Sequence, residues 1–450
     1  MSNLIQFVGD PFVDAGVAVL EFRIKRSCAD FERADLEKQA DELEHLYSKK
    51  AWTGYLSVHF PNSCWCNPTM GVETRNKQRA TLLRSFDAPN LDSTGCSYCG
   101  RPAQHAADRS VIPLVTGAGN MTAGAGGEPG LPVCSACQYA IQFYPLATLK
   151  VNGRPLFWWT PHHEWMYQLT LYFAERVAQI VEGSPDQVVN LGWPSTLLLK
   201  NVEEVFADLG GLGNELPLVD LLGCHVTNYG SGPDYGEIRI SRGLVDFLRS
   251  AQQYSAYRTI RDAAWEDPDA RPRRSTQQGE PKADRGRRNL LFEEFGMRLR
   301  GDEHRSDAVI RRFFRRYAGR EPGVFELACI YARKVLDMTE EQVGAIKELA
   351  GQIATSQHAD RYLDRLFQRS GMTNYLRTLC DISDRMKRAK ESPLSMDTVL
   401  RAFDLAGEDD ATGRDSALVR ELILIRLIEI LPQERVQALA VIDQEESKEQ

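Results

Sequence analysis

The chain has 450 residues and a formal net charge of −8, with 43% hydrophobic and 26% charged residues. This ordinary balance supports two to four globular domains and argues against a uniformly basic coat for nucleic acid. No apolar run approaches the ~18 residues that a membrane helix requires, and the first residues, MSNLIQFVGDPF, lack the features of a secretory signal. We therefore expect a cytoplasmic protein without a membrane partner, whose ten cysteines are reduced unless they hold a metal.

Residues 1–265 mix short apolar runs with aromatics, Gly and Pro, which predicts an N-terminal α+β domain. In the opening GDPFVDAG, Asp10 or Asp14 can cap a following helix, because a carboxylate accepts hydrogen bonds from free N–H groups. Helical spacing of apolar residues predicts helices, and short apolar runs predict strands. The expected helices cover residues 36–50 and 164–183, and the expected strands cover residues 54–62, 195–200 and 235–241.

Residues 266–289 lack large apolar side chains and are rich in Pro, Gly and charge, which predicts a basic flexible linker. Over residues 271–320, fifteen Lys or Arg stand against seven Asp or Glu in an otherwise acidic chain. Such asymmetry favours a local contact with a polyanion, although a solvated linker and helix face would also explain it. The candidate linker cations are Arg271, Arg273, Arg274, Lys282, Arg285, Arg287 and Arg288.

From residue 290 to 450, segments with helical spacing alternate with Gly, Pro, Ser or Asp breaks, which predicts an all-α helical bundle. Ser395 is the expected N-cap of one of these helices. Two helices carry basic clusters that we include among the candidate nucleic-acid contacts: Arg311, Arg312, Arg315 and Arg316 in the first, and Arg385, Lys387, Arg388 and Lys390 in the second.

Two Cys-x-x-Cys pairs, Cys96 with Cys99 and Cys134 with Cys137, flank a long Gly-rich spacer. Each pair can place two sulfurs on one metal ion through a tight turn, and Gly100 suits the positive φ that such a turn requires. In a reducing compartment this spacing predicts a zinc-binding insertion at about residues 94–140. Four thiolates leave zinc no open position, so the expected role of the ion is structural.

The spacer also resembles that of zinc-stapled HNH nucleases, in its Ile-Pro-Leu at residues 112–114 and in Asn120. The position that should hold the general-base histidine holds Arg109, which stays protonated and cannot take a proton from water at neutral pH. His105 comes four residues too early to replace it. We therefore expect no enzyme activity, and a metal-dependent HNH-type nuclease remains the alternative.

Residues 52–67 interleave aromatic side chains with amides. Such side chains can stack on bases and hydrogen-bond to them, or can fill a core. Both interpretations stay open for the candidate nucleic-acid contacts Asn62, Trp65 and Asn67.

Three elements occur in order over about the first 140 residues: GDPFVDAGVAVLEF, FPNSCWCNPTM and the double Cys-x-x-Cys. Together they resemble the CXXC-CXXC family of CRISPR-associated proteins, which are large subunits of type I Cascade, chiefly of subtype I-B. The helical C-terminal zone agrees with the family's general architecture but contains no sharp motif.

The resemblance implies a non-catalytic subunit of an RNA-guided DNA-binding complex in antiviral defence or in transposition. Its N-terminal part would contact the 5′ handle of the guide RNA (crRNA) and recognise the protospacer-adjacent motif in double-stranded DNA. Its C-terminal bundle would resemble a Cascade small subunit and stabilise the R-loop along the hybrid and the displaced strand. The implied partners are the backbone, handle-binding and small subunits, and a helicase-nuclease or transposition proteins. Internal initiation near Met297 could also yield a free copy of the helical bundle that acts as a separate small subunit, and the sequence alone does not decide this.

Overall fold

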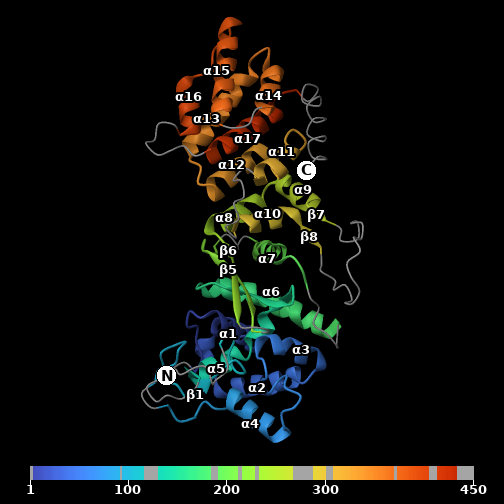
Figure 1. Ribbon diagram of the computed structural model, residues 1–450, viewed down its shortest axis with the longest axis vertical. Coiled ribbons are helices and arrows are strands. Elements are labelled where there is room, and N and C mark those ends of the chain that lie inside the picture. Colours follow the sequence, from blue (N-terminus) through green and yellow to red (C-terminus); the bar gives the residue numbers. More distant parts are fainter. Residues whose placement is uncertain are drawn as a thin grey trace. The chain divides into compact units, whose positions relative to one another are not determined.

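The structure is a computed structural model that describes residues 4–91, 94–115, 130–183, 191–210, 215–228, 233–266, 287–299, 308–368, 372–404 and 413–432. Contacts divide the chain into an N-terminal unit (residues 1–240 and 267–288) and a C-terminal unit (residues 241–266 and 289–450). The described chain is largely helical, with a small antiparallel sheet (Figure 1). The C-terminal unit begins at residue 241, whereas the helical bundle was expected from residue 290. No helix among the described residues is long and apolar enough to cross a membrane.

The N-terminal unit contains both helices and strands. In chain order its elements are α1 (Pro11–Ile24), η1 (Cys28–Asp30), α2 (Arg33–Tyr47), α3 (Lys50–His59), α4 (Val72–Leu83), β1 (His105–Ala107), β2 (Leu131–Val133), α5 (Ser135–Ile141), η3 (Tyr144–Ala147), β3 (Leu149–Val151), β4 (Arg154–Trp159), α6 (His163–Gly183), α7 (Pro194–Leu209), β5 (Leu221–Thr227) and β6 (Asp234–Ile240).

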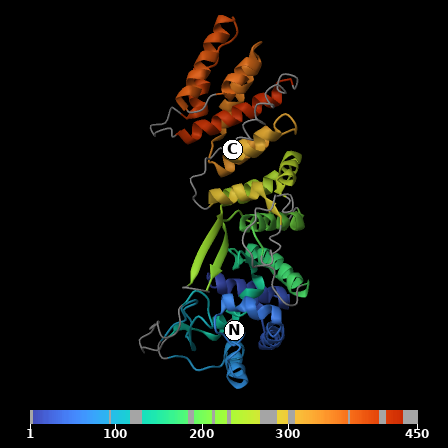
Figure 2. The ribbon, with the colours of Figure 1, turned by 45° about the vertical axis from the view of Figure 1, so that its right-hand side comes forward.

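A four-stranded antiparallel sheet of order β3-β4-β5-β6 lies between helices of this unit. Figure 2 shows the paired strands β5 and β6 side by side. Because side chains alternate along β4, Phe157 and Trp159 face one side of the sheet and Trp158 faces the other. Trp159 Nε1 donates to Asp14 of α1 at 3.1 Å, and Trp158 Nε1 donates to Asn201 of α7 at 2.6 Å. The two helices therefore cover opposite faces of the sheet.

Helix α1 is a central helix of the N-terminal unit, since residues 12–21 are all buried. Asp10 caps it, as predicted, by accepting hydrogen bonds from two backbone N–H groups at 3.0 Å each. Gly16 allows a close approach to α5, because a Cβ at this position would lie 1.9 Å from the carbonyl oxygen of Ala140. These features join helix α1 to helix α5, whose first turn carries the second cysteine pair.

Two segments expected to be strands are helical. Residues 54–62 lie mostly in α3, and residues 195–200 lie in α7. Short apolar runs do not distinguish a strand from a buried helix, and the spacing of buried side chains decides the matter here. The strand expected at residues 235–241 is present as β6. The buried side chains of α3 recur at helical spacing: Trp52, Tyr55, Leu56 and His59.

The C-terminal unit is built from helices. Its elements are α8 (Arg242–Ala251), α9 (Ser255–Ala263), α10 (Leu290–Leu299), the π-helical turn η5 (Ile310–Phe314), α11 (Arg315–Tyr317), α12 (Val324–Val335), α13 (Glu340–Ala354), α14 (Ala359–Phe367), α15 (Met372–Arg388), α16 (Met396–Phe403) and α17 (Gly413–Ile430). Two short strands, β7 (Trp265–Glu266) and β8 (Arg288–Asn289), flank the residues 267–286 that lie outside the description.

An aromatic cluster organises the first half of this unit. The ring of Phe247 in α8 lies 5.1 Å from that of Tyr331 in α12 and 5.9 Å from those of Tyr257 in α9 and Phe295 in α10. Phe314 of η5 completes the cluster at 6.4 Å from Phe247. Helices α8 and α9 therefore contribute to the same core as the helices that follow residue 289.

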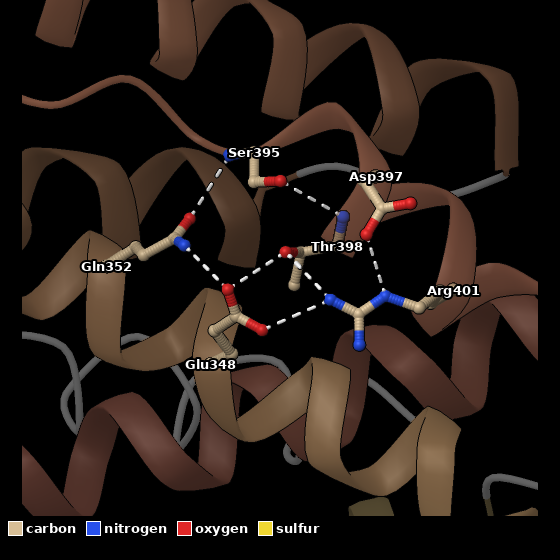
Figure 3. A network of polar contacts seen from close by, with 6 residues as sticks. All are labelled: Glu348, Gln352, Ser395, Asp397, Thr398 and Arg401. Carbon is tan, nitrogen blue, oxygen red and sulfur yellow. Dashed lines mark hydrogen bonds and ion pairs between the residues drawn. The ribbon is translucent and has the colours of Figure 1, made fainter.

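Helices α13 and α16 are joined by a polar network (Figure 3). Ser395 caps α16, as predicted, because its hydroxyl accepts from the backbone N–H of Thr398 at 3.3 Å. Glu348 of α13 accepts from the Thr398 hydroxyl at 3.0 Å and from Arg401 Nη2 at 3.4 Å. The network lies at the surface, since the Glu348 side chain is 45% exposed.

Candidate metal centre

The four cysteines of the two Cys-x-x-Cys pairs come together in the N-terminal unit. The sulfurs of Cys96, Cys99, Cys134 and Cys137 all lie within 4.8 Å of one another, and the Cys99 and Cys134 sulfurs are 3.5 Å apart. A tetrahedron with Zn–S bonds of ~2.3 Å would separate its sulfurs by about 3.8 Å. This cluster can bind a metal ion, and its donor set fits zinc.

The first pair lies in a tight turn. The N–H of Cys96 donates to the carbonyl of Arg101 at 2.6 Å, and the N–H of Gly100 donates back to the carbonyl of Cys96 at 2.9 Å. Gly100 has a φ of 73°, which costs glycine little and other residues more. The turn directs both sulfurs of the pair to the same side, as the spacing predicts.

The second pair belongs to the start of α5. Cys134 is the N-cap of this helix, and its sulfur accepts from the backbone N–H of Cys137 at 3.4 Å. The two turns are linked directly, because the N–H of Ser97 donates to the carbonyl of Pro132 at 2.9 Å. The short antiparallel strands β1 and β2 lie beside this link. This hydrogen bond and the pairing of β1 with β2 thus bring the turn of the second cysteine pair next to that of the first.

The close packing of the thiols shifts their pKa values in opposite directions. Hydrogen bonds with Cys134 and Cys137 lower the pKa of the Cys96 thiol, whereas hydrogen bonds with Cys134 and Cys96 raise the pKa of Cys137. Without a cation, the repulsion between negative charges therefore keeps the four thiols from all being ionised at the same time. A bound divalent metal would supply the compensating charge, because a coordinating thiol is deprotonated outright.

Hydrogen bonds also connect the cluster to its surroundings. Arg101 Nε donates to the Cys99 sulfur at 3.4 Å and would offset part of the negative charge of a four-thiolate site. His105 Nε2 lies 2.9 Å from the hydroxyls of both Ser85 and Ser135, which ties β1 to the end of α4 and to α5. Burial lowers the pKa of His105.

The HNH comparison can be followed residue by residue in this loop. Arg109, at the position of the expected general base, is exposed. Asp108 accepts from the backbone and side chain of Ser110 at 2.9 Å and 2.6 Å. His105 is engaged by the two serines, and Asn120 lies outside the described residues.

The N-terminal candidates for nucleic-acid contacts differ in exposure. Trp65 is 4% exposed, and its Nε1 donates to Gln142 Oε1 at 3.0 Å, so its ring belongs to the core. Asn67 accepts from the backbone and hydroxyl of Thr69 at 3.0 Å and 2.8 Å, which makes it a turn residue. Asn62 is exposed and has a φ of 64°. The core interpretation therefore fits Trp65.

The linker candidates lie mainly outside the described residues, and this applies to Arg271, Arg273, Arg274, Lys282 and Arg285. Arg287 is exposed at the end of that gap. The guanidinium of Arg288 lies 4.4 Å from the ring centroid of Trp193, which is a cation–π contact.

The helical candidates fall into two groups. Arg312 donates to Glu294 at 2.9 Å, and Arg315 donates to the fully buried Glu421 at 3.0 Å and 3.3 Å. Both guanidinium groups are therefore already paired with acids of the C-terminal unit. Among the described residues, no ion pair neutralises the remaining six: Arg311, Arg316, Arg385, Lys387, Arg388 and Lys390.

Sequence reasoning considered Asp14 as a helix cap but did not single out Glu21, the second buried acid of α1. Glu21 is 3% exposed and lies 2.7 Å both from His163 Nε2 and from the backbone N–H of Cys28. Asp14 accepts from the N–H of Val8 at 2.8 Å, and burial raises the pKa of Asp14. The signal was present as two acids seven residues apart in the otherwise apolar run FVDAGVAVLEF.

No family model matches the chain, and neither the curated proteins nor the solved structures give a significant match.

Proposed function

We propose that this chain is the non-catalytic large subunit of a type I CRISPR surveillance complex, of the I-B kind. The observation that carries the proposal is that the three motifs behind the family resemblance all meet helix α5. Cys134 and Cys137 form its first turn, and Trp65 of the second motif hydrogen-bonds to Gln142 at its end. Gly16 of the first motif lies against its backbone. The three motifs, which span about 140 residues of the sequence, thus all contact a single helix.

The metal in this proposal is structural zinc. Four sulfurs within 4.8 Å of one another fill a tetrahedral shell, so no position is left for a reactive water. The residues that would hold the ion are Cys96, Cys99, Cys134 and Cys137, and bound zinc would supply charge compensation and a cross-link between the two turns. The exposed Arg109 in place of a general base supports a binding role over the alternative of an HNH-type nuclease.

In the proposed complex, base pairing with the guide RNA reads the target sequence, and this chain supplies backbone and short-motif contacts. The N-terminal unit contacts the 5′ handle and recognises the protospacer-adjacent motif. The cations of the C-terminal unit that have no ion-pair partner among the described residues hold the hybrid or the displaced strand and so stabilise the R-loop. The assembled complex then recruits a helicase-nuclease or transposition proteins.

The first experiment is a pulldown of the tagged chain, co-expressed with its neighbouring genes, with sequencing of the bound RNA. We expect short RNAs that share one constant 5′ segment, together with co-purifying subunits. Recovery of no RNA, combined with Mg²⁺-dependent DNA cleavage by the chain alone, would overturn the proposal in favour of the nuclease.

A second experiment tests the surface. Arg385→Gln with Arg388→Gln removes two exposed cations that have no ion-pair partner among the described residues. Since the slope of log K against log salt falls by ~0.7–0.9 for each lost phosphate contact, we expect a slope shallower by about 1.5 and weaker binding to every target. The matched control is Arg333→Gln with Lys347→Gln, whose cations already pair with Glu340 and Glu326. Equal slopes for the two double variants would exclude this surface.

A further inference from the structure

Strand β6 (Asp234–Ile240) is the outer strand of the four-stranded sheet, and its second edge has no partner strand among the described residues. The whole strand pairs with β5, from Ile240 opposite Leu221 to Asp234 opposite Thr227. No backbone hydrogen bond joins β6 to any other described part of the chain. Alternate N–H and C=O groups along the outer edge are therefore available to another strand.

The outer edge of β6 is regular and accessible. Its pairing with β5 has no bulge, its sequence DYGEIRI has no proline, and residues 234–237 and 239 are exposed. Gly236 has no side chain in the middle of the strand, as is common where a second backbone approaches closely. A further strand can therefore add to the sheet here, and the charged side chains decide which strand fits.

The charges of β6 are complementary to those of a second copy of the same strand. Among the described residues Glu237 has no ion pair, and Arg239 has one, with Asp220 at 3.1 Å. The Arg239 side chain is still 66% exposed, and a guanidinium has enough N–H donors for a second carboxylate. A two-fold axis at Ile238 places Glu237 of each antiparallel copy opposite Arg239 of the other. Directly opposite Cβ atoms lie about 4.5–5.5 Å apart, within reach of an ion pair.

The neighbouring registers are less favourable. An axis at Glu237 or at Arg239 places that residue opposite itself, and like charges directly opposite destabilise a strand pair. An axis at Gly236 places Asp234 opposite Ile238, which is only 5% exposed. The axis at Ile238 instead places two apolar side chains opposite each other, between two ion pairs. The charge pattern therefore selects one register and favours a second copy of this chain as the occupant.

We propose that this chain forms a two-fold symmetric dimer through β6, in which the two four-stranded sheets join into one antiparallel sheet. The contacts are backbone hydrogen bonds along residues 236–240 of each copy and the two ion pairs between Glu237 and Arg239. So short a contact makes a small interface, and the dimer therefore exchanges with monomer. The inference goes beyond the proposed function and does not depend on it, because it concerns the sheet alone.

The test measures the mass of the full chain by sedimentation equilibrium over a range of concentrations, where we expect a monomer–dimer equilibrium. Glu237→Arg and Arg239→Glu each replace the two attractive pairs by repulsive ones and should weaken self-association by roughly tenfold or more. Glu73→Arg is the matched control, because this acid is exposed on α4 and has no ion pair among the described residues. It makes the same change in net charge and should leave the dissociation constant unchanged.

A mixture of the Glu237→Arg and Arg239→Glu chains gives the sharpest result. Each variant repels its own copy, but one chain of each kind has opposite charges at both positions. We therefore expect heterodimers with about the wild-type affinity, and slower hydrogen exchange of the amides of residues 234–240 when the dimer forms. A wild-type chain that stays monomeric, a dissociation constant equal in the wild type and both β6 variants, or a mixture that does not associate would overturn the proposal. Protection of these amides only on addition of another protein would also overturn it, in favour of a strand from that partner.

Discussion

Glu421 tests which interactions hold the C-terminal unit together. Its carboxylate is fully buried in α17 and accepts hydrogen bonds from Arg315 at 3.0 Å and 3.3 Å and from Arg420 at 2.6 Å. The two arginine side chains are only 11% and 12% exposed. Glu421→Gln preserves the shape of the side chain but removes the buried negative charge that both guanidinium groups contact. Removal of one partner from a buried ion pair costs about 3–5 kcal/mol.

That cost corresponds to a fall of roughly 6–20 °C in the melting temperature, at about 2–4 °C per kcal/mol for a unit of this size. The assay is denaturant and thermal unfolding followed by circular dichroism. Glu348→Gln makes the same substitution in the exposed network of Figure 3 and should cost ~1 kcal/mol or less. Equal destabilisation by the two variants would refute the reasoning, because burial would then make no difference.

Three further predictions concern the two units separately. Chelation of the metal under reducing conditions should abolish the cooperative unfolding transition of the N-terminal unit and leave that of the C-terminal unit unchanged in calorimetry. Burial lowers the pKa of His59 to about 3, below its usual 6.5, so the unfolded chain binds a proton there that the folded chain does not, and the stability present above pH 6.5 is lost as the pH falls toward 3. His59→Gln should therefore make the unfolding free energy depend less steeply on pH between pH 6 and 4, by up to about 1.4 kcal/mol per pH unit, as measured by urea titrations. A fragment of residues 241–450 should unfold cooperatively by circular dichroism, whereas residues 297–450 should not.

Local signals in the sequence predicted local structure well. Asp10 and Ser395 cap helices because each places a short side-chain oxygen before a helical apolar pattern. The two cysteine pairs predicted a four-sulfur cluster, since ligand spacing is a property of the chain itself. The helix caps depend on residues close together in the sequence. The cysteine pairs are far apart, but each pair needs two more ligands to complete a metal site, which the other pair supplies.

Long-range packing was harder to predict. Residues 54–62 resemble a strand by composition, but α3 presents Tyr55 and His59 to the core, and His59 Nδ1 meets the hydroxyl of Tyr144 at 2.6 Å. Nothing local to α3 indicates that partner, which comes 85 residues later. Likewise the cluster RRFFRR reads as one basic surface, yet Arg315 turns inward because Glu421, far along the chain, is buried opposite it.

The aromatic core of the C-terminal unit bears directly on an internal start near Met297. A chain beginning there lacks α8, α9 and most of α10, and so lacks the rings of Phe247 and Tyr257. It would expose the Tyr331 ring, which lies 5.1 Å from Phe247. It would also uncover the backbone of α12 at Lys334, where Gly243 approaches so closely that a Cβ would lie 2.0 Å from the carbonyl oxygen. Losing several such rings costs more than a typical domain's stability margin. A free small subunit with this fold therefore has to begin before α8, or has to receive its missing helices from another chain.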